Sequence, residues 1–155
     1  MSKIFTRSIA NLCVLFVLAS AWGVSPNTSQ AVAQQRGTQH LNIRIGNMIM
    51  TATTEDNPTA RDFVELLPLT LSLRDFSAAE KVSGALPNSL SEEGAPVTDA
   101  GTTGDIAYYA PWKNIAFYRG RGPNAAGVIR IARITSNADA LNQSGDLSVT
   151  ISLSE

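Results

Sequence analysis

The chain has 155 residues, with 12 Lys or Arg against 13 Asp or Glu, and its net charge is −1. Such a balance gives no electrostatic reason to expect a nucleic acid or an anionic membrane surface as partner. A single Cys and a single His exclude an internal disulfide and leave only scattered carboxylates as metal ligands, so we expect neither a metal site nor a cofactor.

The first 33 residues have the pattern of a secretory signal peptide. Lys3 and Arg7 make a positive start, an apolar run follows over 9–21, and Ala31-Val32-Ala33 offers the small residues that signal peptidase recognises. The apolar run is shorter than the roughly 20 residues that a membrane-spanning helix needs, although an uncleaved anchor is the alternative. We therefore predict a signal peptide over 1–33 and an exported protein, periplasmic or secreted, that meets the membrane only during export.

Cleavage at this point removes two basic residues and no acidic one, which leaves 10 basic and 13 acidic side chains. The only cysteine, Cys13, leaves with the signal, so the exported chain must be stable through its core alone. The remaining length suits one domain and is too short for two. We expect a flexible segment over 34–40 and a single domain over 41–155.

Alternating apolar and polar residues predict that most of this domain is β-strand. Residues 41–45 and 48–53 alternate on either side of Gly46-Asn47, a two-residue turn signal, and so predict a hairpin. Further strands are predicted over 69–74, 81–86, 105–110, 114–118, 128–135 and 147–153. Residues 87–104 are rich in Ser, Gly, Pro and acidic side chains, which is typical of a long surface connection.

One segment has the period of a helix instead. Asn57 can cap a helix and Pro58 suits its first position. Apolar residues then recur at helical spacing from Ala60 to Leu67, where Pro68 is expected to end the helix. Seven or eight strands with one helix in a chain of this size predict a closed barrel, because closure removes exposed strand edges.

Six groups of residues, spread over nearly all of the domain, resemble in their order the sequence of a known protein family. They are Asp56-Asn57-Pro58-Thr59-Ala60, Leu66-Leu67-Pro68-Leu69-Thr70-Leu71, Glu80-Lys81, Leu86-Pro87, Gly104-Asp105-Ile106-Ala107-Tyr108-Tyr109-Ala110-Pro111-Trp112 running on into Ala116-Phe117-Tyr118, and Ile131-Ala132-Arg133-Ile134. In this order they resemble the bacterial cyclophilin-like family of small barrels. The resemblance implies a mainly β fold, a closed cyclophilin-like eight-stranded β-barrel with one principal α-helix over one end.

A shared fold does not carry prolyl isomerase activity with it. True cyclophilins use an arginine in a Phe-His-Arg segment and a glutamine in a Gln-Gly-Gly-Asp segment, and the sequence contains neither. His40 lies at the start of the domain, where an exposed strand-edge residue is expected rather than a catalytic one. The loop 119–123 has two arginines that would suit an anion, but it lacks the spacing of a phosphate-binding loop and is predicted to be a hairpin loop. No residue is therefore predicted to be catalytic.

Five aromatic residues gather within eleven positions, namely Tyr108, Tyr109, Trp112, Phe117 and Tyr118. Strand alternation places Tyr108 opposite Tyr109 and Phe117 opposite Tyr118, so one set should fill the barrel and the other should be partly exposed. Trp112, in the connection, is expected at the barrel rim. Two interpretations follow: an exposed aromatic patch that binds an extended peptide or a proline ring, or a plug in which Trp112 and one tyrosine close the end of the barrel.

These observations predict an exported, non-catalytic module that binds an extended or proline-containing peptide or a small ligand. The candidate ligand-binding residues are Tyr109, Trp112, Tyr118, Arg130 and Arg133. The alternative is a divergent peptidyl-prolyl cis-trans isomerase, in which an apolar pocket desolvates the imide and an arginine, Arg130 or Arg119, bonds near its nitrogen.

Overall fold

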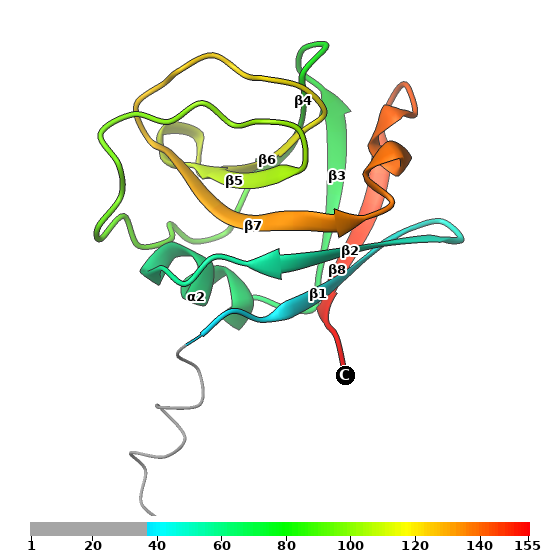
Figure 1. Cartoon of the computed structure of the whole chain (residues 1–155), viewed down its shortest axis with the longest axis horizontal. Coiled ribbons are helices and arrows are strands. Elements are labelled where there is room, and N and C mark those ends of the chain that lie inside the picture. The colour runs from blue at the N-terminus through cyan, green and yellow to red at the C-terminus, as the bar shows by residue number, and fades with distance from the viewer. Residues whose placement is uncertain (1–36) are drawn as a thin grey trace, which may run out of the picture.

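Eight antiparallel strands close into a barrel in the computed structural model, which describes residues 37–155 (Figure 1). The strands are β1 (His40–Ile45), β2 (Met48–Thr54), β3 (Leu69–Asp75), β4 (Glu80–Ala85), β5 (Asp105–Tyr109), β6 (Asn114–Tyr118), β7 (Val128–Ser136) and β8 (Leu147–Leu153). Their order around the barrel is β1-β2-β7-β5-β6-β4-β3-β8, and β8 pairs with β1. The predicted mainly β fold and closed eight-stranded barrel are confirmed, and the predicted strand ends agree to within one residue.

The predicted signal peptide over 1–33 lies outside the described residues. Of the segment 34–40, residues 37–40 are described, and there the backbone N–H of Gln39 donates to Thr54 Oγ1 over 2.7 Å. His40 begins β1 and is exposed. Within 37–155, no helix has both the length and the apolar character to cross a membrane.

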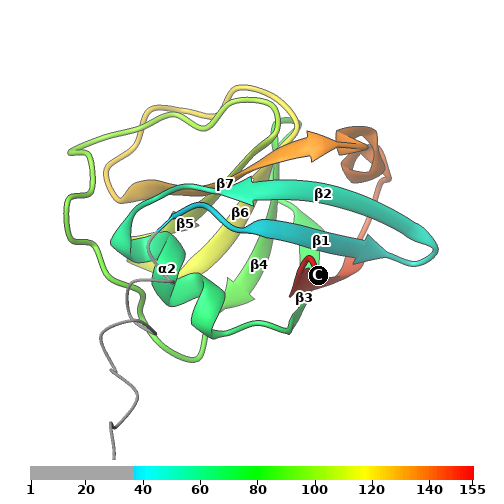
Figure 2. The same ribbon diagram turned by 60° about the horizontal axis from the view of Figure 1, so that its bottom comes forward.

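Helix α2 (Pro58–Glu65) lies over one end of the barrel (Figure 2). As predicted, Asn57 is its cap, because Asn57 Oδ1 accepts the backbone N–H of Ala60 at 2.8 Å. Ala60 and Phe63 are buried and join the barrel interior. The helix ends two residues before the predicted Leu67, since its last turn tightens and the N–H of Leu66 donates to the carbonyl of Phe63.

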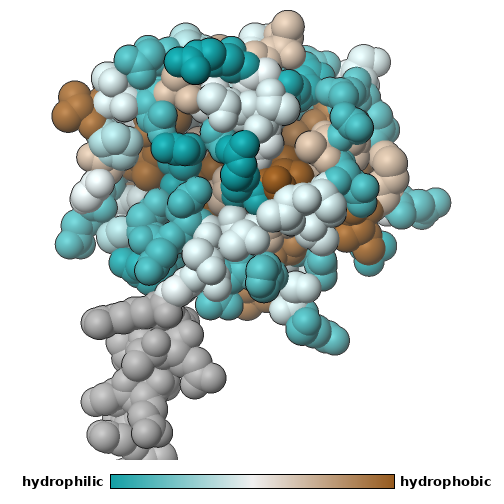
Figure 3. Space-filling model, in the orientation of Figure 1, coloured by the Kyte–Doolittle hydropathy of each residue, from teal (hydrophilic) through white to brown (hydrophobic). Residues whose placement is uncertain are grey.

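Alternate residues of the strands point into the barrel and form its core. Its largest fully buried apolar side chains are Leu41, Ile43, Met50, Phe63, Leu73, Ile106, Tyr108, Ile115, Phe117, Ile131 and Leu141. On the face seen in Figure 3, hydrophilic and neutral residues cover most of the surface, and hydrophobic ones show only in separate patches. The apolar residues are therefore mostly used inside the barrel, as the period-2 pattern predicts.

A second, smaller apolar cluster lies on the outer face of β4, β5, β6 and β7. It consists of Val82, Ala107, Ala116, Tyr118 and Val128. The loop before β5 and the loop after β6 cover it, and the two loops are joined by a bridge between Asp99 and Ala125 (Figure 1). Two short 3-10 helices that the sequence did not predict complete the connections, η1 (Ala110–Trp112) between β5 and β6 and η2 (Ala138–Asn142) between β7 and β8.

A charged cluster closes the end of the barrel near η2, on the far side from α2 in Figure 1. The side chain of Lys81 is fully buried, and its Nζ donates to Asp75 Oδ1 at 2.8 Å and to the carbonyl of Gly145 at 2.7 Å. Arg119 Nη2 lies 2.9 Å from the same Asp75 oxygen, and Arg119 Nη1 donates to the carbonyl of Leu141 at 3.3 Å. These partners satisfy an ammonium group whose burial alone would be costly.

We expect Asp75 to make the stability of the fold depend on acidity. The hydrogen bond from Lys81, followed by that from the Gly145 N–H, holds the pKa of the Asp75 carboxyl below its usual value. A carboxyl whose pKa is depressed by folding adds stability above its unfolded pKa, and this stability is lost as the pH falls through the folded pKa. In thermal melts from about pH 6 to about pH 2, the wild type should therefore lose stability more steeply below about pH 4 than Asp75→Asn does. Parallel curves of thermal stability against pH for the two proteins would contradict this role of Asp75.

Candidate functional site

A groove of about 260 Å³ lies on the outer face of the sheet, over β4, β5 and β6. Its floor is formed by strand residues, namely Glu80, Val82, Tyr109, Asn114, Ala116, Tyr118 and Val128, and its rim by Phe76, Trp112, Pro123 and Ala125. At about 30 Å³ per water molecule the groove has room for roughly nine waters. It therefore suits one or two amino-acid side chains rather than a large ligand.

The pairing of the strands explains why this face is hollow. Ala107 of β5 pairs with Ala116 of β6, and Ala116 pairs with Val82 of β4, so small side chains form one row across the sheet. The neighbouring rows carry large side chains, with Tyr109 in one and Tyr118 in the other. Because large residues stand on both sides of a row of small ones, a depression is left between them.

Three aromatic rings from separate parts of the chain form a row at the rim. Trp112 stands edge-on to Tyr109, with ring centroids 5.4 Å apart, and edge-on to Phe76, with centroids 5.5 Å apart. Such T-shaped pairs are favourable contacts between aromatic rings. Phe76 and Trp112 are each 50% exposed, whereas Tyr108 is buried inside the barrel. Trp112 therefore lies outside the barrel as part of an exposed patch, and the interpretation of Trp112 as a plug is wrong.

Tyr118 lines the groove but is more buried than strand alternation predicts, at 3% exposed. Gly101 and Gly122, from the two covering loops, approach its ring so closely that a Cβ at Gly101 would overlap ring atoms Cε2 and Cζ, and one at Gly122 would overlap Cε1. Burial, followed by the nearby Glu80 carboxylate, raises the pKa of Tyr118 to about 12. Its phenol is therefore neutral at physiological pH.

Two polar side chains of the groove have oxygens without a hydrogen-bond partner among the described residues. Glu80 is 6% exposed, burial raises its pKa, and no hydrogen bond or ion pair joins its carboxylate to any residue of 37–155. Asn114 donates through Nδ2 to the carbonyl of Ser83 at 3.1 Å, but its Oδ1 is buried without a donor in the same range. Both are acceptors, but Asn114 Oδ1 is fully buried, so it is the Glu80 carboxylate that can accept a hydrogen bond from a molecule bound in the groove.

The comparisons with known proteins give the family. The model of the Cyclophilin-like family matches residues 43–152, which include the groove and most of the barrel. The chain belongs to the cyclophilin-like family. No curated protein matches it. The cyclophilin-like domain is also similar to a hypothetical protein from Archaeoglobus fulgidus, whose solution structure has 19% sequence identity, covers 75% of this chain and 95% of that chain, and gives a TM-score of 0.54. At this identity the likeness shows the fold alone.

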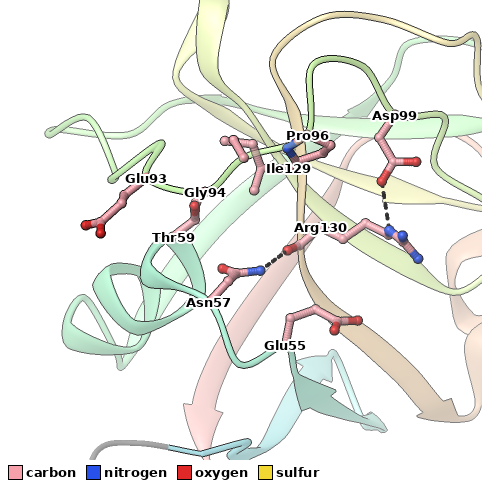
Figure 4. Close-up of a pocket in the computed structure, with 10 residues that line it drawn as sticks. Glu55, Asn57, Thr59, Glu93, Gly94, Pro96, Asp99, Ile129 and Arg130 are labelled. Atoms are coloured by element: carbon pink, nitrogen blue, oxygen red, sulfur yellow. Dashed lines mark hydrogen bonds and ion pairs between the residues drawn. The ribbon is translucent and has the colours of Figure 1, made fainter.

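The groove of the cyclophilin-like domain brings together three of the five predicted ligand-binding residues, Tyr109, Trp112 and Tyr118. Arg130 lines a different pocket, of about 160 Å³, between the start of α2 and the loop before β5 (Figure 4). Its Nε donates to Asp99 Oδ2 at 2.8 Å, and this hydrogen bond raises the pKa of Arg130. Arg133 is paired in the same way, since its Nη1 donates to the buried Asp105.

The pocket beside Arg130 in this cyclophilin-like domain also has two further carboxylates on its walls. Glu55 lies on the strand side and Glu93 on the loop side, as Figure 4 shows. Among residues 37–155, however, no group of three or more His, Cys, Asp or Glu side chains is arranged to hold a metal ion. The unpartnered acceptors and exposed rings favour the aromatic groove as the candidate binding site.

Phe76 and Glu80 belong to the groove of the cyclophilin-like domain but were not predicted. Phe76 follows the last residue of β3, and Glu80 begins β4. Alternation with the buried Lys81 places Glu80 on the outer face of the strand, which is a signal that could have been used. No local pattern, in contrast, indicates that Phe76 contacts Trp112.

Proposed function

We propose that this cyclophilin-like protein is an exported, non-catalytic module that binds an extended peptide in the groove over β4, β5 and β6. The row of rings formed by Phe76, Trp112 and Tyr109 lies beside a hollow, with Phe76 and Trp112 half-exposed, and it is the observation that carries the proposal. Aromatic side chains bind peptide side chains and proline rings by burying a large apolar area at a low cost in side-chain entropy.

The expected affinity is modest. Burying the exposed half of Trp112 contributes about 2–3 kcal/mol at about 25 cal/mol per Å², and Phe76 adds a smaller amount. Association costs several kcal/mol of lost freedom of motion. We therefore expect a single short peptide to bind with a dissociation constant of about 0.1–1 mM.

Replacing Trp112 with alanine should weaken peptide binding about tenfold or more and leave the fold intact, because the ring is half-exposed and outside the core. Binding is measured from ¹⁵N chemical shift changes on titration with a blocked Ala-Pro-Ala peptide, and the fold from circular dichroism. Ile49→Ala is the matched control, since Ile49 is an exposed apolar residue at the β1–β2 hairpin, away from the groove. Unchanged binding by Trp112→Ala, or no shift change at groove residues in the wild type, would overturn the proposal.

The same samples test the isomerase alternative. Arg119 is committed to Asp75 and to backbone carbonyls, Arg130 to Asp99, and no arginine lines the groove among residues 37–155. A coupled isomerisation assay on a Xaa-Pro peptide should thus give no acceleration above background. Turnover that Arg130→Ala abolishes would replace the binding proposal with an enzymatic one.

The export part of the proposal is supported by the pattern of residues 1–33. It predicts that the mature protein begins at Gln34 and that its intact mass, measured on protein recovered outside the cytoplasm, has the corresponding value. A full-length chain retained in the cytoplasm would contradict export without affecting the groove.

A further inference from the structure

We propose that the groove takes a side chain that ends in a cation, with the cation at Glu80 and the apolar stem on Trp112. The inference rests on the proposed function and specifies its ligand.

Glu80 is the exception among the buried charged residues. Within 37–155 three charged residues are buried, and two of them have partners: Lys81 pairs with Asp75, and Asp105 pairs with Arg133. The Glu80 carboxylate has none in that range, although the residue is only 6% exposed. The carboxylate oxygens are not fully buried and can accept hydrogen bonds from water, although the low exposure of the residue leaves them less well hydrated than those of a surface carboxylate. A cationic donor bound in the groove would supply the partner that residues 37–155 do not.

The position of Glu80 directs its carboxylate to the bound molecule. Glu80 pairs with Tyr118 on the outer face of the sheet, and both residues line the groove. Gly122 of the covering loop leaves space beside it, since a Cβ there would come within 2.7 Å of Glu80 Oε1. The loop thus limits the access of bulk water to the carboxylate without supplying a donor, and this reduced hydration strengthens its attraction for a cation.

The other groups of the groove are complementary to a cation as well. No Lys, Arg or His lines the groove among the described residues, so no positive charge opposes a cation there. The exposed rings of Trp112 and Phe76 can contact an alkyl stem and attract a positive charge over their faces. An anionic ligand would meet the Glu80 carboxylate and no cationic side chain of the described residues.

Three blocked tripeptides with alanine at both ends and lysine, arginine or norleucine at the centre test the inference on the full chain. Norleucine keeps the four-carbon stem of lysine and lacks its ammonium group. The lysine or arginine peptide should bind about tenfold more tightly than the norleucine peptide at low salt, the range expected for a charge-assisted hydrogen bond. The comparison between lysine and arginine identifies which cation the groove prefers.

Glu80→Gln should abolish this preference and leave norleucine binding unchanged. The variant keeps the shape of the side chain, and its thermal midpoint should be no lower than that of the wild type, because a poorly hydrated charge without a partner among residues 37–155 has been removed. Glu92→Gln, which removes an exposed carboxylate from the loop before β5, is the control and should keep the preference.

The outcomes separate this inference from the proposed function. If all three peptides shift groove resonances with equal affinity, the groove binds peptides and the inference about the cation is wrong. If the preference for a cation survives in Glu80→Gln, the role given to Glu80 is wrong. If no peptide shifts groove resonances, both the inference and the proposed function are wrong. The wild-type comparison of lysine with norleucine decides the matter even if Glu80→Gln does not fold.

Discussion

Replacing Lys81 with alanine should lower the free energy of unfolding by about 3 kcal/mol. The side chain is among the largest that are fully buried, so alanine leaves a cavity at the end of the barrel. The substitution also removes the hydrogen bonds to Asp75 and to the carbonyl of Gly145. Asp75 still has Arg119 as a partner, which keeps the effect below that of an isolated buried charge.

Lys81→Met is the informative control because it keeps most of the volume and removes the charge. It should cost about 1 kcal/mol or less, since exchanging a buried ion for an apolar side chain of similar size is often nearly neutral. Urea denaturation at neutral pH, with equal m-values for all three proteins, measures both effects. A Lys81→Ala variant within about 1 kcal/mol of the wild type would contradict the position of this side chain in the barrel.

The second large effect is expected from Gly101→Ala, which should destabilise the protein by about 2–3 kcal/mol and weaken peptide binding. The added Cβ would overlap the ring of Tyr118, and Gly122 approaches the same ring from the loop after β6, so the ring has little room to move. Displacing Tyr118 also alters the floor of the groove. Thermal melts and the peptide titration measure the two consequences separately.

Gly84→Ala is the matched control, because Gly84 is an exposed glycine of β4 with no atom within 4 Å of its added Cβ. It should change stability by no more than about 0.5 kcal/mol. The cause of the Gly101 effect is tested in a Tyr118→Ala background, where Gly101→Ala should cost little because the ring is gone. An equal cost with and without the ring would show that the overlap is not the cause.

Local patterns in the sequence determined the strands and the helix of this protein. Successive side chains of a strand point to opposite faces, so the alternation in 147–153 identifies β8 and its inward residues without any knowledge of its neighbours. The same rule places Tyr108 and Phe117 inside the barrel. The cap at Asn57 is equally local, since it involves only the backbone three residues further on.

The tertiary structure decided where the two arginines that were predicted to bind a ligand, Arg130 and Arg133, point. Strict alternation places Arg130 and Arg133 on opposite faces of β7, three positions apart. A shift in register opposite Ile106 and Ala107 lets both arginines lie outside while the residues between them are buried. Their carboxylate partners lie 31 and 28 residues away along the chain, so no local pattern indicates that both guanidinium groups are already paired.

The groove itself was also decided by the tertiary structure. Phe76, Glu80 and Trp112 come from separate elements, and they meet only because β4 pairs with β6 when the barrel closes. Alternation gives the face of a strand on which Glu80 lies, but the path of a loop over that face depends on contacts between distant residues. The alternation of apolar residues and the cap of a helix depend on residues within one element. Burial of a carboxylate and contact between rings depend on residues that are brought together only when the barrel closes. The sequence pattern therefore predicts the former, and only the folded chain shows the latter.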